Sequence, residues 1–259
     1  MSESPYSRPE IYALAFSFRD YPKAVDFLTE AAAAAGMDRI ESMVELGCGP
    51  GQYCLEFARR GVTAFGIDLS PEMVGYAQTK AEQAKLPCRL IEADMRTFRL
   101  PQKVDLAICM MATFHLMLTN RDVVEHFDTV ADNLTDTGLY IIELSHPKDM
   151  FNPGSAARNK WTMDDGLVSV STEWACDAVI DPLTEINTGT VHFAVKHPTL
   201  VEEFSFQEQW REISAGLIRA LIELSGRFKI AAMYGDLDLN VPFDNSDKAW
   251  RMVIVLRKM

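Results

Sequence analysis

The chain has 259 residues, of which 48% are hydrophobic and 24% are charged, a balance typical of a folded protein with one large α/β domain or two small ones. Its formal net charge of −12 disfavours a nucleic-acid partner, because basic side chains bind a phosphate backbone. No apolar run approaches the ~20 residues of a membrane span, and the first residues lack the features of a secretory signal. We therefore expect no membrane partner and a cytoplasmic location.

The cysteines are five in number and form neither a CxxC pair nor a cluster with histidine. A disulfide framework and a structural zinc site are therefore not expected, and no other grouping of His, Asp and Glu suggests a metal. The mostly apolar neighbours of the cysteines indicate buried thiols in a reducing compartment.

The first part of the chain alternates between apolar runs and segments with helical spacing. A helix is expected from Pro22 to Gly36, since proline favours the first turn and glycine the end. Strand, helix, strand in this rhythm predicts parallel pairing through right-handed crossovers. The expected strands are 43–46, 62–67, 88–91, 104–109 and 138–144, and the expected helices between them are 52–60, 71–84 and 121–134.

The pattern changes after Pro147. Residues 148–166 contain Pro, Gly, Asn and paired Asp and indicate a loop, whereas the next segments alternate and carry β-branched residues, which predicts an antiparallel sheet. The expected antiparallel strands are 167–180, 185–195 and 200–210, followed by a helix over 211–225 and strands over 228–234 and 249–257. We therefore expect an α/β fold in three segments: 1–146, an inserted antiparallel sheet at 147–210, and 211–259.

The most informative stretch is Met-Val-Glu-Leu-Gly-Cys-Gly-Pro-Gly at 43–51, where the first strand ends and a helix begins. In an open parallel sheet this is a preferred ligand crevice. Gly47, Gly49 and Gly51 lack a Cβ where the backbone must turn sharply or approach a ligand. Glu45 stands at the strand end, where it can bind a ligand ammonium or hold the glycine loop.

Acidic residues also follow the next two expected strands. Asp68 can accept hydrogen bonds from ribose hydroxyls, and Asp94 can accept one from an exocyclic amine, although an aspartate there is equally a turn or cap residue. A dinucleotide fingerprint fails because Gln52 follows Gly51, and Glu45 would repel a pyrophosphate. A nucleoside with a positively charged amino-acid tail fits better.

The three motifs together resemble class I S-adenosylmethionine-dependent methyltransferases. The matching stretches are Glu-Leu-Gly-Cys-Gly-Pro-Gly at 45–51, Gly-Ile-Asp-Leu-Ser-Pro-Glu-Met at 66–73 and Glu-Ala-Asp-Met at 92–95. The resemblance implies S-adenosylmethionine as cofactor and a Rossmann-like seven-stranded sheet, mostly parallel with its last strand antiparallel and with helices on both faces. It also implies a glycine loop around the methionine moiety, Asp68 on the ribose, Leu69 on the adenine, and Asp94 with the Met95 backbone at the adenine edge. Cys48, Met73 and Met110 are implied to lie beside the cofactor.

The stretch from Cys109 to Thr119, after the fourth expected strand, bears on the methyl acceptor. It lacks both the Asn/Asp-Pro-Pro-Tyr of methyltransferases that act on base amines or glutamine and the Pro-Cys of cytosine C5 enzymes. It is similar to small-molecule methyltransferases that N-methylate amino sugars and other metabolites. The resemblance implies a small-molecule acceptor, methylated on nitrogen or oxygen, and an N-terminal lid with Tyr12, Phe16 and Arg19, although aromatic residues at helical spacing are commonly core.

Methyl transfer from a sulfonium needs alignment and exclusion of water more than it needs a base. If a base is used, His115 is the first candidate and His146, at the end of the fifth expected strand, is the second. Each also has a structural interpretation: His115 can cap a turn or pack under the lid, and His146 precedes Pro147.

The inserted sheet must cover its apolar faces. It can lie over the cofactor crevice, which would bring Trp161, Trp174 and Phe206 near the substrate, it can pack against the α/β domain, or it can pair with a second copy in a homodimer. Two other functions remain open at this point: a catalytically silent adenosylmethionine-binding subunit and a nucleotide-dependent oxidoreductase.

Overall fold

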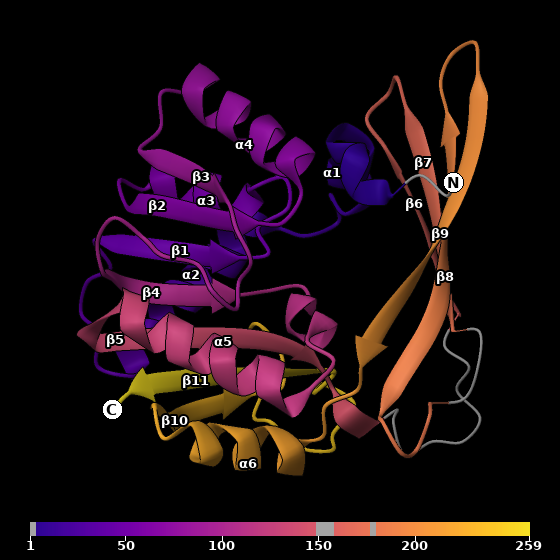
Figure 1. The fold of residues 1–259 in the computed structure, drawn as a ribbon. Coiled ribbons are helices and arrows are strands. Elements are labelled where there is room, and N and C mark those ends of the chain that lie inside the picture. The colour runs from indigo at the N-terminus through magenta and orange to yellow at the C-terminus, as the bar shows by residue number, and fades with distance from the viewer. Residues whose placement is uncertain (1–3, 149–157, 177–179) are drawn as a thin grey trace.

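The computed structural model describes residues 4–148, 158–176 and 180–259, which form two sheets with a short helix between them (Figure 1). The larger sheet has seven strands in the order β10-β11-β5-β4-β1-β2-β3. These strands are β1 (Ser42–Leu46), β2 (Thr63–Asp68), β3 (Cys88–Glu92), β4 (Val104–Cys109), β5 (Leu134–Ser145), β10 (Phe228–Tyr234) and β11 (Arg251–Lys258). Strands β1 to β5 pair in parallel, and β11 runs antiparallel to both of its neighbours. The expected Rossmann-like sheet with an antiparallel last strand is confirmed.

Helices cover both faces of this sheet. They are α2 (Tyr21–Ala34), α3 (Gln52–Arg59) and α4 (Pro71–Gln83) on one face and α5 (Asn120–Asn133) and α6 (Ala215–Ser225) on the other. Side chains alternate between the two layers, so that Met43 packs with the first group of helices and Val44 with the second. Because both faces are buried, the strands are nearly continuous apolar runs.

Side-chain caps define where the crossover helices begin. The Ser70 hydroxyl accepts the Met73 N–H at 3.2 Å at the start of α4, and Thr119 and Asp122 form a reciprocal capping box at the start of α5. Helix α6 begins at Ala215 rather than at 211, because the preceding strand continues to Arg211 and Ser214 caps the helix.

The second sheet is antiparallel and has four strands in the order β6-β7-β8-β9. These are β6 (Arg158–Asp164), β7 (Ser169–Cys176), β8 (Ile186–Lys196) and β9 (Val201–Arg211). The expectation of a continuous loop over 148–166 was wrong at β6; residues 149–157 of that segment lie outside the described residues. Strand β6 is polar in sequence, and tertiary contacts of Trp161 with Phe16 and Phe18 contribute its apolar packing.

The short helix α1 (Pro9–Ala15) lies between the two sheets, after the single turn η1 (Pro5–Ser7). Ile11 and Ala15 of α1 pack with Val170, Val191 and Phe193 of the second sheet in one buried cluster. The apolar face of the second sheet is therefore covered in part by a helix of the same chain. In the part of the chain that the structure describes, no helix has the length and apolarity needed to cross a membrane.

Candidate functional site

The glycine loop joins β1 to α3 at the carboxyl edge of the seven-stranded sheet. Gly47 has φ +63°, and a Cβ there would lie 2.3 Å from the Thr113 Cγ2, so only glycine fits. Gly49 has φ +51°, and the nearest atom to a Cβ there would be the Tyr12 Cε1 at 3.9 Å. Gly51, also at positive φ, is the N-cap of α3. The loop therefore turns sharply and leaves the space before Gly49 to the ring of Tyr12 or to a ligand.

Glu45 lies buried beneath this loop. Its carboxylate accepts the Cys54 N–H at 3.1 Å and also the Cys54 thiol at 3.1 Å. Burial raises the pKa of Glu45 to about 8, and no cationic side chain of the described residues forms an ion pair with it. Glu45 therefore holds the first turn of α3 and is also a buried carboxyl group without a cation, a state that an ammonium group would stabilise.

Asp68 ends β2 and joins two segments of the site. One carboxylate oxygen accepts the Gly49 N–H at 2.7 Å and the other accepts the Ser70 N–H at 2.9 Å. Burial raises the pKa of Asp68. Leu69, next in the chain, is 67% exposed, whereas Met73 is fully buried in α4. Asp68 thus fixes the glycine loop against the start of α4, and Leu69 offers an apolar surface beside it.

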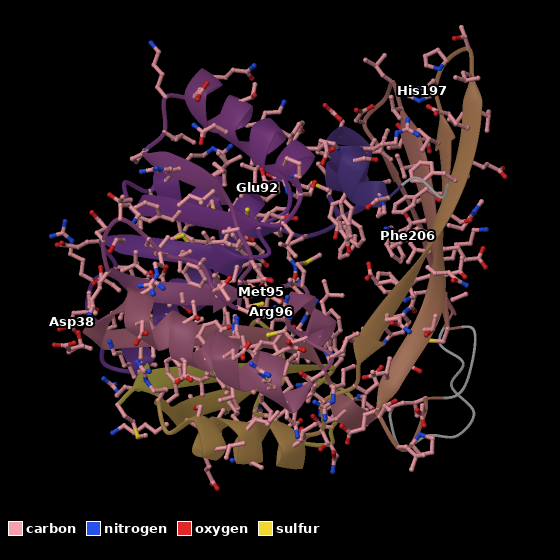
Figure 2. All side chains as sticks on the ribbon, viewed as in Figure 1. Asp38, Glu92, Met95, Arg96, His197 and Phe206 are labelled. Atoms are coloured by element: carbon pink, nitrogen blue, oxygen red, sulfur yellow. The ribbon has the colours of Figure 1, made fainter. Side chains whose placement is uncertain are left out.

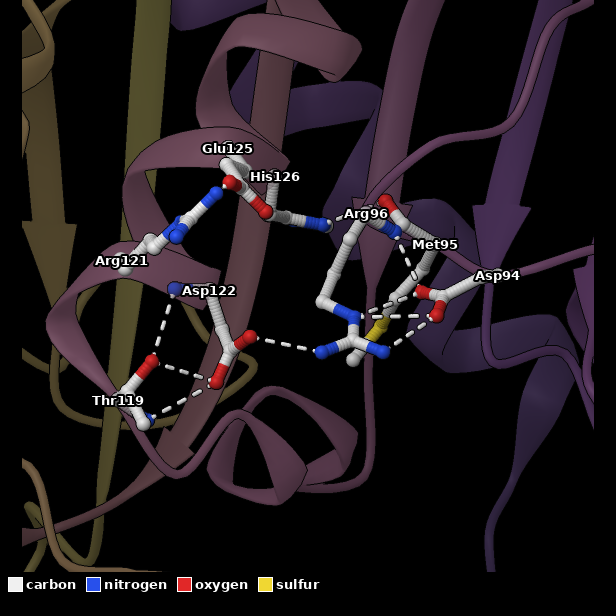
Figure 3. A network of polar contacts seen from close by, with 8 residues as sticks. All are labelled: Asp94, Met95, Arg96, Thr119, Arg121, Asp122, Glu125 and His126. Atoms are coloured by element: carbon white, nitrogen blue, oxygen red, sulfur yellow. Dashed lines mark hydrogen bonds and ion pairs between the residues drawn. The ribbon is translucent and has the colours of Figure 1, made fainter.

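The third motif has a different environment from the one expected (Figure 3). Both carboxylate oxygens of Asp94 accept from the guanidinium of Arg96, at distances from 2.6 to 3.0 Å, and Arg96 also bonds Asp122 at 2.7 Å. The Arg96 partner lowers the pKa of Asp94. The Met95 carbonyl accepts from the Nδ1 of His126 at 2.8 Å. Sequence reasoning missed Arg96, and the contact of Asp94 with an adenine amine stays a prediction.

A cavity opens where the glycine loop, the N-terminal segment and the end of β4 meet, with an empty volume of about 430 Å³ including the part open to solvent. Of the residues singled out from the sequence, it brings together Tyr12, Phe16, Glu45, Gly47, Cys48, Gly49 and Met110. Gly51, Asp68, Leu69, Met73, Asp94 and Met95 are not among its lining residues. The cavity therefore joins the loop and the lid at one end of the expected crevice.

Tyr53 lines this cavity and was missed from the sequence. Its side chain is fully buried, and its hydroxyl has no hydrogen-bond partner within the described residues. A buried hydroxyl without a partner costs free energy, on the order of 1–3 kcal/mol. At position 53 a tyrosine on the buried face of a helix is expected to be core, so the sequence carries no signal for its hydroxyl. The hydroxyl therefore keeps unused hydrogen-bonding capacity in a residue that lines the cavity.

Arg19, which the resemblance assigns to the lid, is held by a buried ion-pair network. Its guanidinium donates to the Glu143 carboxylate at 2.7 Å, and Glu143 also pairs with Arg251 and accepts the Met111 N–H at 3.1 Å. The side chains of Arg19 and Glu143 are 7% and 2% exposed. The sequence gives no indication of a function for Glu143, which lies within an apolar strand. In the structure this residue of β5 links the N-terminal segment, through Arg19, to β11, through Arg251.

The two candidate bases have structural partners at both ring nitrogens. The His115 Nδ1 bonds the Arg211 carbonyl at 2.6 Å and its Nε2 accepts the Ser145 N–H at 3.2 Å. His146 is bonded in the same way, to the Asp244 carbonyl at 2.9 Å and the Lys148 N–H at 3.1 Å. Burial lowers the pKa of His115. Both imidazoles therefore lock backbone segments, and neither presents a free nitrogen to the cavity.

The three aromatic residues expected over the crevice are all half-buried and pack in different places. The Trp161 indole donates to the Ala15 carbonyl at 2.7 Å and thereby anchors α1 to the second sheet. Trp174 packs on Trp210 with ring centroids 5.5 Å apart. Phe206 lies on the side of β9 that faces α1 and the seven-stranded domain (Figure 2), 6.2 Å from the ring of Tyr6.

Comparison with known proteins agrees with this geometry. Residues 43–138 match the family model described as a methyltransferase domain. The dTDP-3-amino-3,4,6-trideoxy-alpha-D-glucopyranose N,N-dimethyltransferase of Streptomyces venezuelae is 24% identical over 46% of this chain and 50% of its own length. The trans-aconitate 2-methyltransferase of Enterobacter sp. (strain 638) is 33% identical over 38% of this chain and 36% of its own.

The similarity to a solved structure extends further along the chain. An S-adenosylmethionine-dependent methyltransferase from Clostridium acetobutylicum ATCC 824 superposes with a TM-score of 0.78 at 19% identity, over 95% of this chain and 94% of its own. The alignments with the curated relatives span half of their length or less. Residues 43–138 are therefore similar to a methyltransferase domain, and the chain has the fold of S-adenosylmethionine-dependent methyltransferases.

Proposed function

We propose that this protein transfers the methyl group of S-adenosylmethionine to a small-molecule acceptor. The observation that carries the proposal is the cavity lined by the glycine turn, by Glu45, a buried carboxyl group without a cation, and by Tyr53, whose hydroxyl has no hydrogen-bond partner among the described residues. An amino-acid tail carries both an ammonium and a carboxylate, and this cavity offers an acceptor for the first and a donor for the second. Glu45 would hold the ammonium, and the Tyr53 hydroxyl would donate to the carboxylate.

The remaining residues would hold the nucleoside part. Asp68 would accept from the ribose hydroxyls while keeping the glycine loop in place, and Leu69 would cover the adenine with its exposed side chain. Asp94 and the Met95 backbone are proposed for the adenine edge, as the family resemblance implies. Cys48 and Met110, which line the cavity, would lie on its walls.

When bound, S-adenosylmethionine supplies a methyl group activated on a sulfonium. The protein's own contribution is then to align the acceptor and to exclude water. Tyr12 and Phe16 line the mouth of the cavity from α1 and its C-cap, and Arg19 ties the segment that follows them to the domain through Glu143. His115 and His146 have no role in this proposal, because backbone groups occupy their ring nitrogens.

We further propose a small molecule, rather than a nucleic acid, as acceptor because the net charge of −12 opposes binding to phosphates. A cytoplasmic location is supported by the free cysteines, which form no disulfide. We do not propose self-pairing of the second sheet through its apolar face, because α1 packs against that face within one chain.

Calorimetric titration with S-adenosylhomocysteine tests the proposal. We expect binding in the low micromolar range, a scale usual for enzyme ligands, and no binding of NAD⁺ or NADP⁺ in a parallel titration. A protein that releases no heat and shows no thermal shift with either adenosylmethionine or adenosylhomocysteine would rule the proposal out. Binding of NADP⁺ in their place would favour the oxidoreductase interpretation.

A further inference from the structure

We propose that Glu208, with the rings of Tyr6, Tyr12 and Phe206, forms the subsite that binds the acceptor, and that this acceptor is an amine bound through its ammonium group. The inference rests on the proposed methyltransferase function and names the chemical class of its acceptor. The comparisons leave this class open, because the two curated relatives are named for an amino sugar and for trans-aconitate.

Glu208 lies on the inner face of β9. Along this strand exposure alternates, so that Glu208 and Phe206 are half-buried while Gln207 and Gln209 between and beside them are exposed. The Tyr6 hydroxyl donates to the Glu208 carboxylate at 2.8 Å. The carboxylate is therefore fixed on the side of the second sheet that faces α1 and the methyltransferase domain.

A cluster of aromatic rings begins at Tyr6, the hydrogen-bond partner of this carboxylate. The ring of Tyr6 lies 6.2 Å from that of Phe206 and 5.7 Å from that of Tyr12, centroid to centroid. The faces of aromatic rings carry negative potential and attract cations, and a carboxylate among them adds a full charge. A carboxylate beside a cluster of aromatic rings is the chemistry that recognises an ammonium group rather than a second carboxylate.

Glu208 also lacks the cation that its neighbours have. On the same strand Glu202 pairs with Arg8 at 2.9 Å, and nearby Glu185 pairs with Arg211 at 2.7 Å. Within the residues that the structure describes, Glu208 makes no ion pair, and burial raises its pKa. Desolvation of an unpaired carboxylate is unfavourable, and a bound ammonium would offset that cost.

The subsite adjoins the proposed cofactor site at two points. The Tyr12 ring lies over Gly49, with its Cε1 3.9 Å from where a Cβ on that glycine would be. The Tyr6 carbonyl accepts from the Ser70 hydroxyl at 3.0 Å, and the Ser70 N–H is bonded to Asp68. Tyr12 through its ring and Tyr6 through its backbone carbonyl thus lie beside the loops that are proposed to hold the cofactor, as an acceptor site requires.

In the proposed methyl transfer, Glu208 would accept a proton from the bound ammonium group. An ammonium nitrogen has no free electron pair, so one N–H proton must first move to the Glu208 carboxylate. The nitrogen pair then forms the new N–C bond while the C–S bond breaks and its electron pair stays on sulfur, which converts the sulfonium to a neutral thioether. Burial, which raises the pKa of Glu208, makes it a better acceptor for that proton.

Matched probes test the charge preference without knowledge of the natural acceptor. Benzylamine, which is a cation at neutral pH, and benzyl alcohol, which is neutral and of the same shape, are titrated into protein saturated with S-adenosylhomocysteine. We expect wild type to bind benzylamine roughly tenfold more tightly, the scale of one charge-assisted contact. Glu208→Gln keeps an acceptor for Tyr6 and should abolish the preference.

Glu203→Gln is the matched control, because Glu203 lies on the same strand with a side chain that is 64% exposed, and it should retain the preference. If Glu208→Gln fails to fold, Phe206→Leu tests the same subsite and should reduce the preference a few-fold. Binding of adenosylhomocysteine with no preference for benzylamine, or a preference that survives Glu208→Gln, would overturn the inference and leave the proposed function intact. Failure to bind adenosylhomocysteine would instead count against the proposed function on which the inference rests.

Discussion

The two sides of the proposed site are built in different ways. The cofactor side is made of backbone held by carboxylates: Asp68 accepts N–H groups of the glycine loop and of the start of α4, and Glu45 accepts one from the first turn of α3. The acceptor side is made of side chains from η1 and α1 on one hand and from β9 on the other. These segments lie far apart in the sequence, since the hydrogen bond from Tyr6 to Glu208 joins residues 202 positions apart.

This difference has a physical cause. A glycine turn that must accommodate a ligand depends on φ angles and on the absence of a Cβ, and these are properties of consecutive residues. A subsite between two sheets depends on which side chains the second sheet turns inward and on what covers them. The cofactor side is therefore sensitive to backbone changes, and the acceptor side to the anchoring of α1 on the second sheet.

The largest effect is expected from Gly49→Val on the cofactor side. At φ +51° a β-branched residue is strained, and its side chain would occupy the space before the loop. Binding of adenosylhomocysteine should be abolished in calorimetry. Gly61→Val is the control, since Gly61 also has positive φ, +85°, with nothing within 4 Å; it should lose stability but bind normally. Equal loss of binding in both variants would contradict the role of the loop.

Asp68→Ala should weaken cofactor affinity by about 1.5–3 kcal/mol, the scale for losing charge-assisted hydrogen bonds. Part of this loss will come from the freed Gly49 and Ser70 N–H groups. Asp105→Ala removes a carboxylate that accepts the Glu41 and Ser42 N–H groups at the opposite edge of the sheet, so it should lower the melting temperature without changing affinity. Normal binding by Asp68→Ala would exclude the ribose contact.

Tyr53→Phe separates ligand binding from folding. Removing a buried hydroxyl without a protein partner should leave the free energy of unfolding unchanged or raise it, while affinity for adenosylhomocysteine falls by about 1 kcal/mol. Tyr140→Phe should lower the free energy of unfolding and leave the affinity unchanged, because the Tyr140 hydroxyl bonds the His126 Nε2 at 2.6 Å in the core. Thermal unfolding and calorimetry on both variants make the comparison, and unchanged affinity in Tyr53→Phe would argue against the carboxylate contact.

The smallest effect is expected on the acceptor side. Trp161→Phe keeps an aromatic ring, although a smaller one, and loses the hydrogen bond to the Ala15 carbonyl, which contributes about 1 kcal/mol. Amide hydrogen exchange in α1 should become several-fold faster, with β1 to β5 unaffected. Trp250→Phe is the control, since Trp250 is 51% exposed and stacks on Arg251. Equal exchange in α1 of the wild type and Trp161→Phe would show that the second sheet does not anchor the helix.

The elements of the seven-stranded domain could be predicted closely, because apolar runs bounded by caps and glycines are local signals. Strand β2, expected over 62–67, lies at Thr63–Asp68, and α4 begins at Pro71 as expected. Strand β6 could not be predicted in the same way, since it is polar and gains its apolar contact only when Trp161 meets Phe16. The histidines show the same limit: His115 follows a strand end, but its partners lie on Arg211 and Ser145.

The sequence by itself determined the parallel sheet and the glycine turn, because backbone geometry and hydrophobic periodicity are written in neighbouring residues. Only the tertiary structure decided which polar groups lack a partner. The orphaned hydroxyl of Tyr53 and the unpaired carboxylate of Glu208 depend on burial and on the absence of a donor, acceptor or cation among described neighbours that are distant in sequence. Three-dimensional packing decides which hydrogen-bond and ion-pair partners a buried polar group has, and the proposed acceptor side of this protein depends on that packing.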